Sequence, residues 1–131
     1  MTDPETMLER LVDATQLLAQ PPEVQESLLP SFVVVTDELA QGYSDAYLLL
    51  AQIRNAGLID ATQQECFDRV QEVLEEMSRQ GDKGTWSVEG LRSSDEWKSV
   101  RLAARSALDS LGRELRLPTL EGVTFVKSRR L

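Results

Sequence analysis

Residues 60–81, DATQQECFDRVQEVLEEMSRQG, decide the fold class because they describe one long amphipathic helix with a recognisable start and end. Asp60 with Gln63 three residues later has the spacing of a capping box, and Gly81 stands where helices commonly end. At about 100° per residue, one side of this helix collects Cys66, Phe67, Val70, Val73, Leu74 and Met77. The pattern predicts a helix over about 61–80 that packs on other elements.

A second long helix is predicted after a short corner of the chain. Ser94 is a suitable N-cap, acids follow in the first turn, and Pro118 closes a segment that runs from Asp95 to about Arg116. Its apolar side consists of Trp97, Val100, Ala104, Ala107, Leu108, Leu111 and Leu115. Because the connection is short, we expect the two long helices to be antiparallel neighbours.

The residues before the quoted stretch also indicate helices. Thr2 and Glu5 have capping-box spacing, and the first helix has to stop near Pro21. Further helical segments are predicted over residues 23–29, from about Phe32 to Gly42, and over 44–57.

These elements define an all-α fold class. We expect residues 1–118 to form a single-domain bundle of five to six helices with short loops, since 131 residues suit one domain. Residues 119–131 are expected to form a C-terminal tail or a short strand around Val123, Phe125 and Val126.

Charge is distributed unevenly along the chain. Residues 1–78 hold fifteen acids and three bases, whereas residues 79–131 hold seven acids and eleven bases. We call one group of carboxylates on the helix over 61–80 the acidic face: Glu65, Asp68, Glu72, Glu75 and Glu76. We call one group on the later helix the basic arc: Lys98, Arg101, Arg105, Arg113 and Arg116.

Both charged surfaces allow two interpretations. The acidic face is either the solvated surface of an acidic bacterial-type protein or a docking surface for a basic partner, which clustered carboxylates would attract while repelling nucleic acid. The basic arc either complements acidic helices within the fold or across a dimer, or it binds phosphates. We favour the internal role, because the whole chain carries a net charge of −8 and is not expected to bind nucleic acid.

The composition removes most catalytic chemistry. The chain contains no histidine, and therefore lacks the commonest general base and the commonest metal ligand. Its single cysteine, Cys66, lies among acids that oppose thiolate formation, so we expect it to be structural. We predict no catalytic residue, no metal ligand and no cofactor.

Carboxylate chemistry with magnesium or manganese stays open as an alternative. Glu72 with Glu75, Glu23 with Glu26, and Glu65 with Asp68 all have the i, i+3 spacing that places two carboxylates on one helix face. All-α nucleotide pyrophosphohydrolases hold metals with such pairs, but their carboxylates face the bundle interior.

The corner over residues 81–94 contains a Gly-Lys-Gly-Thr order that suggests a phosphate-binding loop. However, Lys83 precedes Gly84, Asp82 adds a repelling charge, and a helix rather than a strand precedes the loop. The stretch is better interpreted as a turn between helices. Trp86, which lies within it, is expected either to pack at the end of the bundle or to serve as a contact anchor for a partner.

The leading hypothesis is a non-catalytic cytoplasmic protein-binding module. It would use the acidic face and Trp86 to dock on a basic protein partner, most concretely as an immunity protein or antitoxin that neutralises a toxin enzyme. The alternatives are a magnesium- or manganese-dependent nucleotide hydrolase and a homo-oligomeric, for example dimeric, structural or adaptor protein. No secretory signal or membrane span is apparent, and one unpaired cysteine suits a reducing compartment.

Overall fold

The structure, a computed structural model, describes residues 2–29 and 34–118, and these residues form helices and connections without a strand. The elements are α1 (Pro4–Ala19), α2 (Pro22–Leu28), α3 (Val35–Tyr47), α4 (Leu50–Asn55), α5 (Ala61–Gln80), α6 (Val88–Ser93) and α7 (Asp95–Ser110). The predicted all-α bundle is confirmed. The expected tail or strand over 119–131, with Val123, Phe125 and Val126, lies outside the described residues, as does Phe32.

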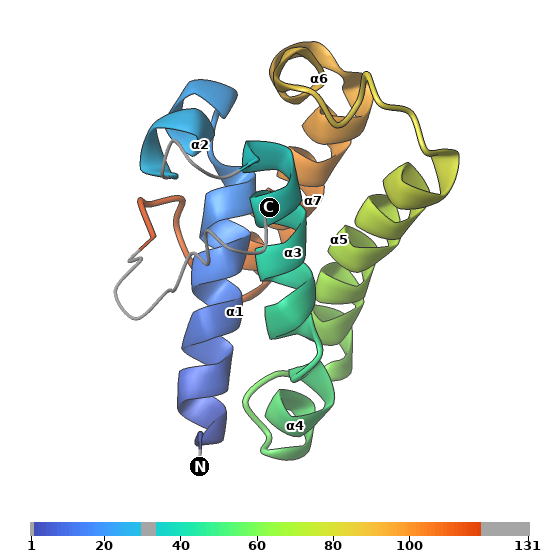
Figure 1. The fold of residues 1–131 in the computed structure, drawn as a ribbon. Coiled ribbons are helices and arrows are strands. Elements are labelled where there is room, and N and C mark those ends of the chain that lie inside the picture. The colour runs from blue at the N-terminus through green and yellow to red at the C-terminus, as the bar shows by residue number, and fades with distance from the viewer. Residues whose placement is uncertain (1, 30–33, 119–131) are drawn as a thin grey trace.

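The longer helices α1, α3, α5 and α7 build the bundle, and Figure 1 shows how they lie together. Helix α7 packs on both α1 and α5, while α3 packs on α1 and α5 from the other side. The short helix α4 lies at the end of the bundle where α1 begins, and α2 and α6 lie at the opposite end. Each long helix therefore has an apolar side that faces the others.

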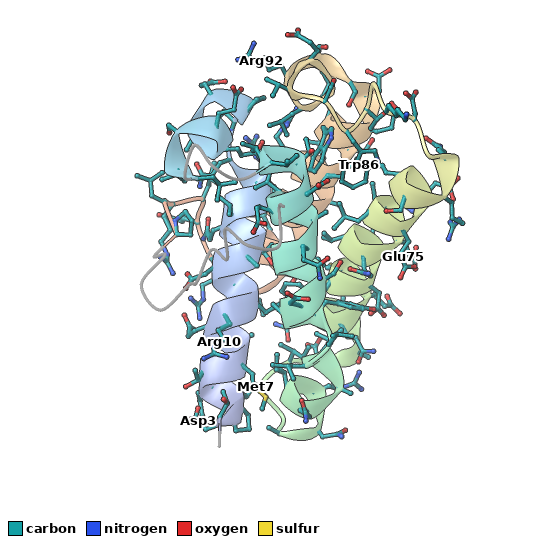
Figure 2. All side chains as sticks on the ribbon, viewed as in Figure 1. Asp3, Met7, Arg10, Glu75, Trp86 and Arg92 are labelled. Carbon is teal, nitrogen blue, oxygen red and sulfur yellow. The ribbon has the colours of Figure 1, made fainter. Side chains whose placement is uncertain are left out.

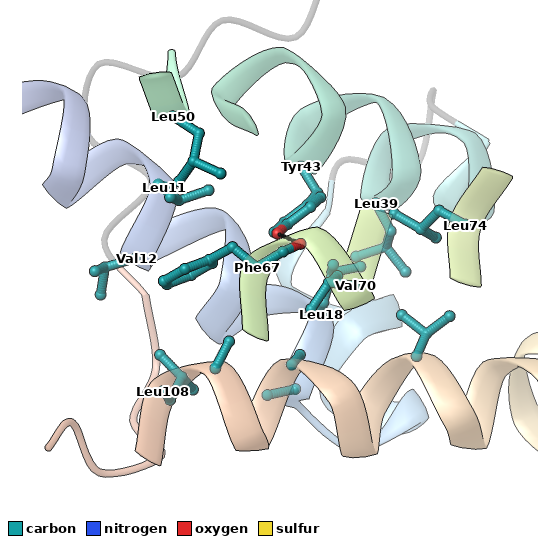
Figure 3. Packing of buried hydrophobic residues seen from close by; sticks show 14 of the residues in the cluster. Leu11, Val12, Leu18, Leu39, Tyr43, Leu50, Phe67, Val70, Leu74 and Leu108 are labelled. Carbon is teal, nitrogen blue, oxygen red and sulfur yellow. Dashed lines mark hydrogen bonds between the residues drawn. The ribbon is translucent and has the colours of Figure 1, made fainter. Parts of the chain in front are cut away.

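The core contains most of the apolar residues that the sequence predicts for α5 and α7. In Figure 3, Phe67 and Val70 of α5 lie between Leu11 of α1, Tyr43 of α3 and Leu108 of α7. The core residues of α5 and α7 are Phe67, Val70, Leu74, Met77, Trp97, Val100, Ala104, Ala107 and Leu108. Inside this core the Tyr43 hydroxyl donates a hydrogen bond to the Phe67 carbonyl at 2.8 Å.

Helix α5 begins and ends where its sequence indicates. The Asp60 carboxylate accepts from the Gln63 backbone N–H at 2.8 Å, and the Gln63 side chain accepts from the Asp60 backbone N–H at the same distance. Gly81 ends the helix with a φ of 65°, a left-handed conformation that favours glycine. These contacts satisfy backbone groups that a helix terminus leaves without partners.

Four predicted boundaries are wrong, since residues 44–57 divide between the end of α3 and the separate helix α4. Helix α3 continues through Gly42 to Tyr47, because a glycine inside a helix weakens it but does not end it when its neighbours are buried. Helix α7 ends at Ser110 instead of near Arg116, because Gly112 adopts a φ of 69°. The cap of α1 is Asp3, whose carboxylate accepts from the Thr6 backbone N–H at 2.8 Å, and not Thr2.

The early end of α7 frees a segment that runs along α1, and we call residues 113–116 the C-terminal strap. The Gln16 amide group donates to the Glu114 carbonyl at 2.8 Å and accepts from the Arg116 backbone N–H at 2.9 Å. The Gln20 amide group donates to the Arg116 carbonyl at 2.7 Å. The side chains of two buried glutamines, Gln16 of α1 and Gln20 at its C-cap, thus supply hydrogen bonds that a neighbouring strand would otherwise make. Leu115, predicted to lie in the core, is exposed on this strap.

Replacing Gln16 with leucine is expected to lower the free energy of unfolding by about 2 kcal/mol, because it leaves a carbonyl and an N–H of the strap without partners. Urea unfolding measures this loss, and hydrogen exchange at the Arg116 amide should accelerate. Gln52→Leu, at an exposed position of α4, is the matched control and should change stability by less than about 0.5 kcal/mol. Unchanged exchange at Arg116 would contradict the proposed role of Gln16.

Candidate docking surface on helix α5

The structure places the acidic face on the outer side of α5. Glu65, Glu72, Glu75 and Glu76 are exposed, and Asp68 is half-buried. The opposite side of the helix carries the buried residues Phe67, Val70, Leu74 and Met77. Four of the five carboxylates are therefore accessible to another molecule.

Asp68 differs from the other members of the acidic face because it holds two helices together. Its carboxylate accepts a hydrogen bond from the Tyr47 hydroxyl of α3 at 2.6 Å. Burial, together with this bond to a carboxylate, raises the pKa of the Tyr47 phenol, which keeps the hydroxyl a donor. The Tyr47 ring also stacks on Tyr43, with the two centroids 6.0 Å apart. Asp68 therefore has a structural role in joining α5 to α3.

The remaining carboxylates have weak or local partners. Glu72 lies 3.8 Å from Arg69, and both side chains are mostly exposed. Glu76 pairs with Arg79, whose hydrogen bond lowers the pKa of the Glu76 carboxyl. Exposed ion pairs within one helix contribute little stability, so a cation from a partner can replace them at small cost. Among the described residues, Glu75 accepts a hydrogen bond from the Gln71 amide at 3.2 Å.

A groove of about 810 Å³ lies beside this face, between α3 and α5, and we call it the α3–α5 groove. Its lining consists of Asp37, Ala40, Gln41, Ser44, Gln71, Leu74, Glu75, Ser78, Arg79, Gly81, Lys83 and Trp86. Figure 2 shows Trp86 between the upper ends of α3 and α5, with Glu75 further down α5. The structure thus brings two separately predicted docking residues into one concave surface.

Trp86 packs at the end of the bundle, which is the first of the two roles that the sequence left open. Its ring meets Trp97 edge to face, with centroids 5.7 Å apart, and its indole N–H donates to the Met77 carbonyl at 3.4 Å. The Thr36 hydroxyl donates to the Trp86 carbonyl at 2.7 Å. Trp86 is therefore fixed at the end of the bundle, and one part of its side chain still lines the groove.

The basic arc turns inward at its centre. Arg101 is buried and donates to the Leu91 carbonyl at 3.1 Å, and burial lowers the pKa of its guanidinium. Arg105 donates to the Ala19 carbonyl at 3.2 Å, at the end of α1. Both arginines thus satisfy carbonyl groups of other segments.

The rest of the basic arc does not form one helix face, because Arg113 and Arg116 follow the end of α7. Arg113 pairs with Glu9 at 2.6 Å, and Arg116 lies 3.9 Å from Asp13. Lys98 is exposed and lies 4.0 Å from Asp95. All four arginines contact other segments of the same chain, which agrees with the internal role expected for the basic arc.

The carboxylate pairs considered for metal binding are not assembled into a larger cluster. Glu72 and Glu75 are exposed, and Glu26 receives two hydrogen bonds from Arg92, at 2.8 and 3.0 Å. Within residues 2–29 and 34–118, no three or more cysteine, aspartate or glutamate side chains come together as a possible metal site. Over the same residues, no helix is long and apolar enough to cross a membrane.

The loop that resembled a phosphate site uses its own carboxylate instead. The Asp82 side chain accepts from the Gly84 backbone N–H at 2.8 Å, so this donor already has an anionic partner. The hydroxyl of Ser87 donates to the Gly84 carbonyl at 2.6 Å and accepts from the Gly90 backbone N–H at 3.0 Å. The segment forms a helix-capping turn, as its glycine and serine positions indicate.

Sequence reasoning missed the other wall of the groove. Asp37, Gln41 and Ser44 of α3 line it, yet no local pattern shows that this side of α3 lies across from α5. Lys83, considered in the sequence only as part of a phosphate loop, also lines the groove. The acid in the first turn of α3 was the one available signal, and it has a more ordinary explanation in the helix dipole.

No protein-family model, curated protein or solved structure matches the chain. The fold and the site define its class as an all-α bundle with an exposed acidic helix face beside a groove.

Proposed function

We propose that this protein is a non-catalytic, cytoplasmic protein-binding module that docks on a basic partner through the acidic face and the α3–α5 groove. The observation that carries the proposal is the joint presence of Glu75 and Trp86 in one groove. Carboxylates increase the rate of encounter with a cationic surface, and tryptophan is enriched among the residues that dominate binding energy.

The distribution of exposed charge supports the acidic face as the surface that meets the partner. The four arginines of the basic arc are engaged in internal contacts, whereas Glu65, Glu72, Glu75 and Glu76 are exposed on one helix. A partner that offers lysine or arginine side chains would meet carboxylates whose existing partners are weak. The basic partner, and not nucleic acid, is the ligand that this surface attracts.

An immunity protein or antitoxin is the most concrete form of the proposal. Enzymes that cut nucleic acids hold phosphates with basic residues around their active sites. A rigid bundle with an acidic face could cover such a site and compete with the nucleic acid for the same cations. This form of the proposal predicts that the partner loses enzymatic activity on binding.

The triple variant Glu72→Lys, Glu75→Lys and Glu76→Lys is expected to weaken partner binding at least a hundredfold, because three attractive contacts become repulsive. The products of the adjacent genes, co-expressed with the protein, are the first partners to assay. Isothermal titration at two salt concentrations would measure the affinity, and the loss should be smaller at the higher concentration because salt screens exposed charges.

The matched control is the triple variant Glu5→Lys, Asp109→Lys and Glu114→Lys, which makes the same change in net charge at exposed positions away from α5. It should bind the partner nearly as well as the wild type. Equal losses in the two triple variants would show that net charge, and not the acidic face, is responsible. A salt-sensitive dimer without any such partner would instead favour the homo-oligomeric alternative.

The hydrolase alternative has a separate test. If magnesium or manganese raises the melting temperature and Glu72→Ala abolishes the increase, a metal binds at this helix and the docking proposal loses its basis.

A further inference from the structure

We propose that the C-terminal strap is an open strand edge on which a second copy of this chain pairs antiparallel, so that two protomers form a weak two-fold dimer. The inference goes beyond the proposed function, because the strap lies beside α1 on the side away from α5 (Figure 1). Three features of the strap carry this pairing: its hydrogen bonds, its exposed leucines and the order of its charges.

The strap has the hydrogen-bonding pattern of an extended strand on one of its sides. Residues 113–118 belong to no helix or turn. Gln16 contacts both the Glu114 carbonyl and the Arg116 N–H, at 2.8 and 2.9 Å, and Gln20 donates to the Arg116 carbonyl at 2.7 Å. In an extended strand, the backbone groups of alternate residues point to the same side. The groups of residues 114 and 116 therefore face α1, and those of the residue between them face away.

The other side of the strap is an unpaired edge. Among the described residues, the backbone groups of Leu115 and Leu117 take part in no hydrogen bond. The side chains of these two leucines are 44% and 62% exposed. Such an edge is a template for another strand, and apolar side chains beside it are stabilised when the added strand covers them.

The glutamines limit the assembly to two copies. They occupy the edge of the strap that faces α1, so each protomer offers the opposite edge for pairing. When two such edges meet around a two-fold axis, both are used up. The pair is therefore closed, and a third copy finds no edge to extend.

The charge order of the strap selects one register. When Leu115 lies opposite Leu115 of the second copy, Glu114 lies opposite Arg116, and this pairing occurs twice around the axis. Both charged side chains are accessible, since Glu114 is exposed and Arg116 lies 3.9 Å from Asp13 with 48% of its side chain exposed. A shift that sets Leu115 opposite Leu117 would place the two Arg116 side chains against each other, which is destabilising. The order of acid, leucine and arginine thus complements a second copy of itself.

This register also defines the hydrogen bonds between the copies. The two Leu115 residues form a hydrogen-bonded pair and exchange two N–H···O bonds. The Leu117 N–H of each protomer approaches the Arg113 carbonyl of the other. Arg113 keeps its own N–H on the Leu108 carbonyl at 2.9 Å, so this pair contributes one bond on each side of the axis. A contact of this size is small, and we expect a weak dimer.

Nuclear Overhauser effects in a mixture of isotope-labelled and unlabelled full-length protein test the register directly. The Hα atoms of Glu114 and of Arg116 in the second copy face each other, because Cα atoms in a non-hydrogen-bonded pair are about 4.5 Å apart. We expect this intermolecular cross-peak at about 1 mM protein, a concentration suited to a small contact. Self-association without the cross-peak would overturn the strap contact. A monomer at this concentration, or a strap that contacts residues 119–131 of its own molecule instead, would overturn the dimer.

Charge reversal provides the matched comparison. Glu114→Arg should weaken self-association at least about tenfold in sedimentation equilibrium, because two attractive pairs become repulsive. Glu65→Arg, the same change at an exposed position of α5, should alter it less than about twofold. Equal weakening by the two variants would indicate another surface and contradict pairing at the strap.

A mixture of two variants tests the same register by rescue. Arg116→Glu alone should also weaken self-association, but mixed with Glu114→Arg it should restore association to at least the wild-type level. In the mixed dimer, every pair of opposed side chains at positions 114 and 116 has opposite charges. Thermal unfolding first confirms that Arg116→Glu folds beside Asp13, and if it does not, the cross-peak in the wild type decides. Two folded variants that fail to associate would contradict the register.

The dimer and the proposed docking function can fail separately. If the protein is monomeric but the Glu72, Glu75 and Glu76 triple variant loses its partner, the docking function stands and the strap pairing is wrong. If the strap cross-peak is present but the same triple variant binds its partner as the wild type does, the pairing stands and the acidic face is not the docking surface.

Discussion

Replacing Trp97 with alanine is expected to lower the free energy of unfolding by about 3–5 kcal/mol, the range typical of removing a large aromatic side chain from a core. Trp97 has no exposed surface, and its ring meets Trp86 edge to face. Its indole N–H donates to the Thr85 carbonyl at 2.8 Å, and Thr85 is itself buried. The substitution removes apolar burial, a ring contact and the only hydrogen-bond donor recorded for this carbonyl among the described residues.

Two further variants separate these contributions in urea unfolding. Trp97→Phe keeps a ring but leaves the Thr85 carbonyl without its donor, and it should lose about 1–3 kcal/mol. Lys98→Ala, on the exposed side of the same helix, should lose less than about 0.5 kcal/mol. A loss below about 1 kcal/mol for Trp97→Ala would contradict the enclosed position of this side chain, because removing a buried tryptophan side chain typically costs about 3–5 kcal/mol.

Gly90→Ala is expected to lower the free energy of unfolding by about 2–3 kcal/mol, at the upper end for overpacking. A Cβ atom at Gly90 would lie 2.1 Å from the Gly84 carbonyl oxygen and 2.4 Å from the Thr85 carbonyl oxygen. Both neighbours are backbone atoms that cannot rotate away. Helix α6 or the preceding loop would have to move, and this would disturb the buried Leu91.

Gly42→Ala adds the same methyl group with the opposite expected result. Gly42 lies inside α3, and a Cβ atom there would have no neighbour within 4 Å. Alanine should raise the free energy of unfolding by about 0.4–1 kcal/mol, because it reduces the conformational freedom of the unfolded chain. Thermal unfolding of both variants checks the signs. Stabilisation by Gly90→Ala would show that α6 does not approach the loop so closely.

The predicted elements and the observed ones agree best where the signals are local. The Asp60 capping box, the apolar side of α5 and the Ser94 cap of α7 were all predicted, because each depends on residues within about one helical turn of each other. The sorting of Glu72 and Glu75 away from the core followed from the same periodicity. Cys66, predicted as a core residue, is only partly buried at the edge between α5 and α7.

Helix ends were predicted wrongly where the same local residues are compatible both with the end of a helix and with its continuation. Gly42 and Gly112 both follow a helical pattern in the sequence, but only Gly112 adopts a left-handed φ and ends its helix, whereas Gly42 lies inside α3. The difference depends on tertiary packing, since α3 stays helical while Leu39 and Tyr43 are buried against other helices. Helix propensity alone does not tell a glycine that ends a helix from one that lies inside it. Glycine costs a helix about 1 kcal/mol, and the burial of neighbouring apolar side chains outweighs this cost.

The sequence by itself determined the helical class, the sides of α5 and α7 that enter the core, and the separation of charge along the chain. Periodicity and capping are short-range properties, so they can be recognised without knowing which helices meet. Only the tertiary structure decided the α3–α5 groove, the inward contacts of the basic arc and the strap. These depend on pairs such as Tyr47 with Asp68 and Gln16 with Glu114, which are 21 and 98 residues apart. Such pairs form because the helices pack in one arrangement, which no local pattern specifies.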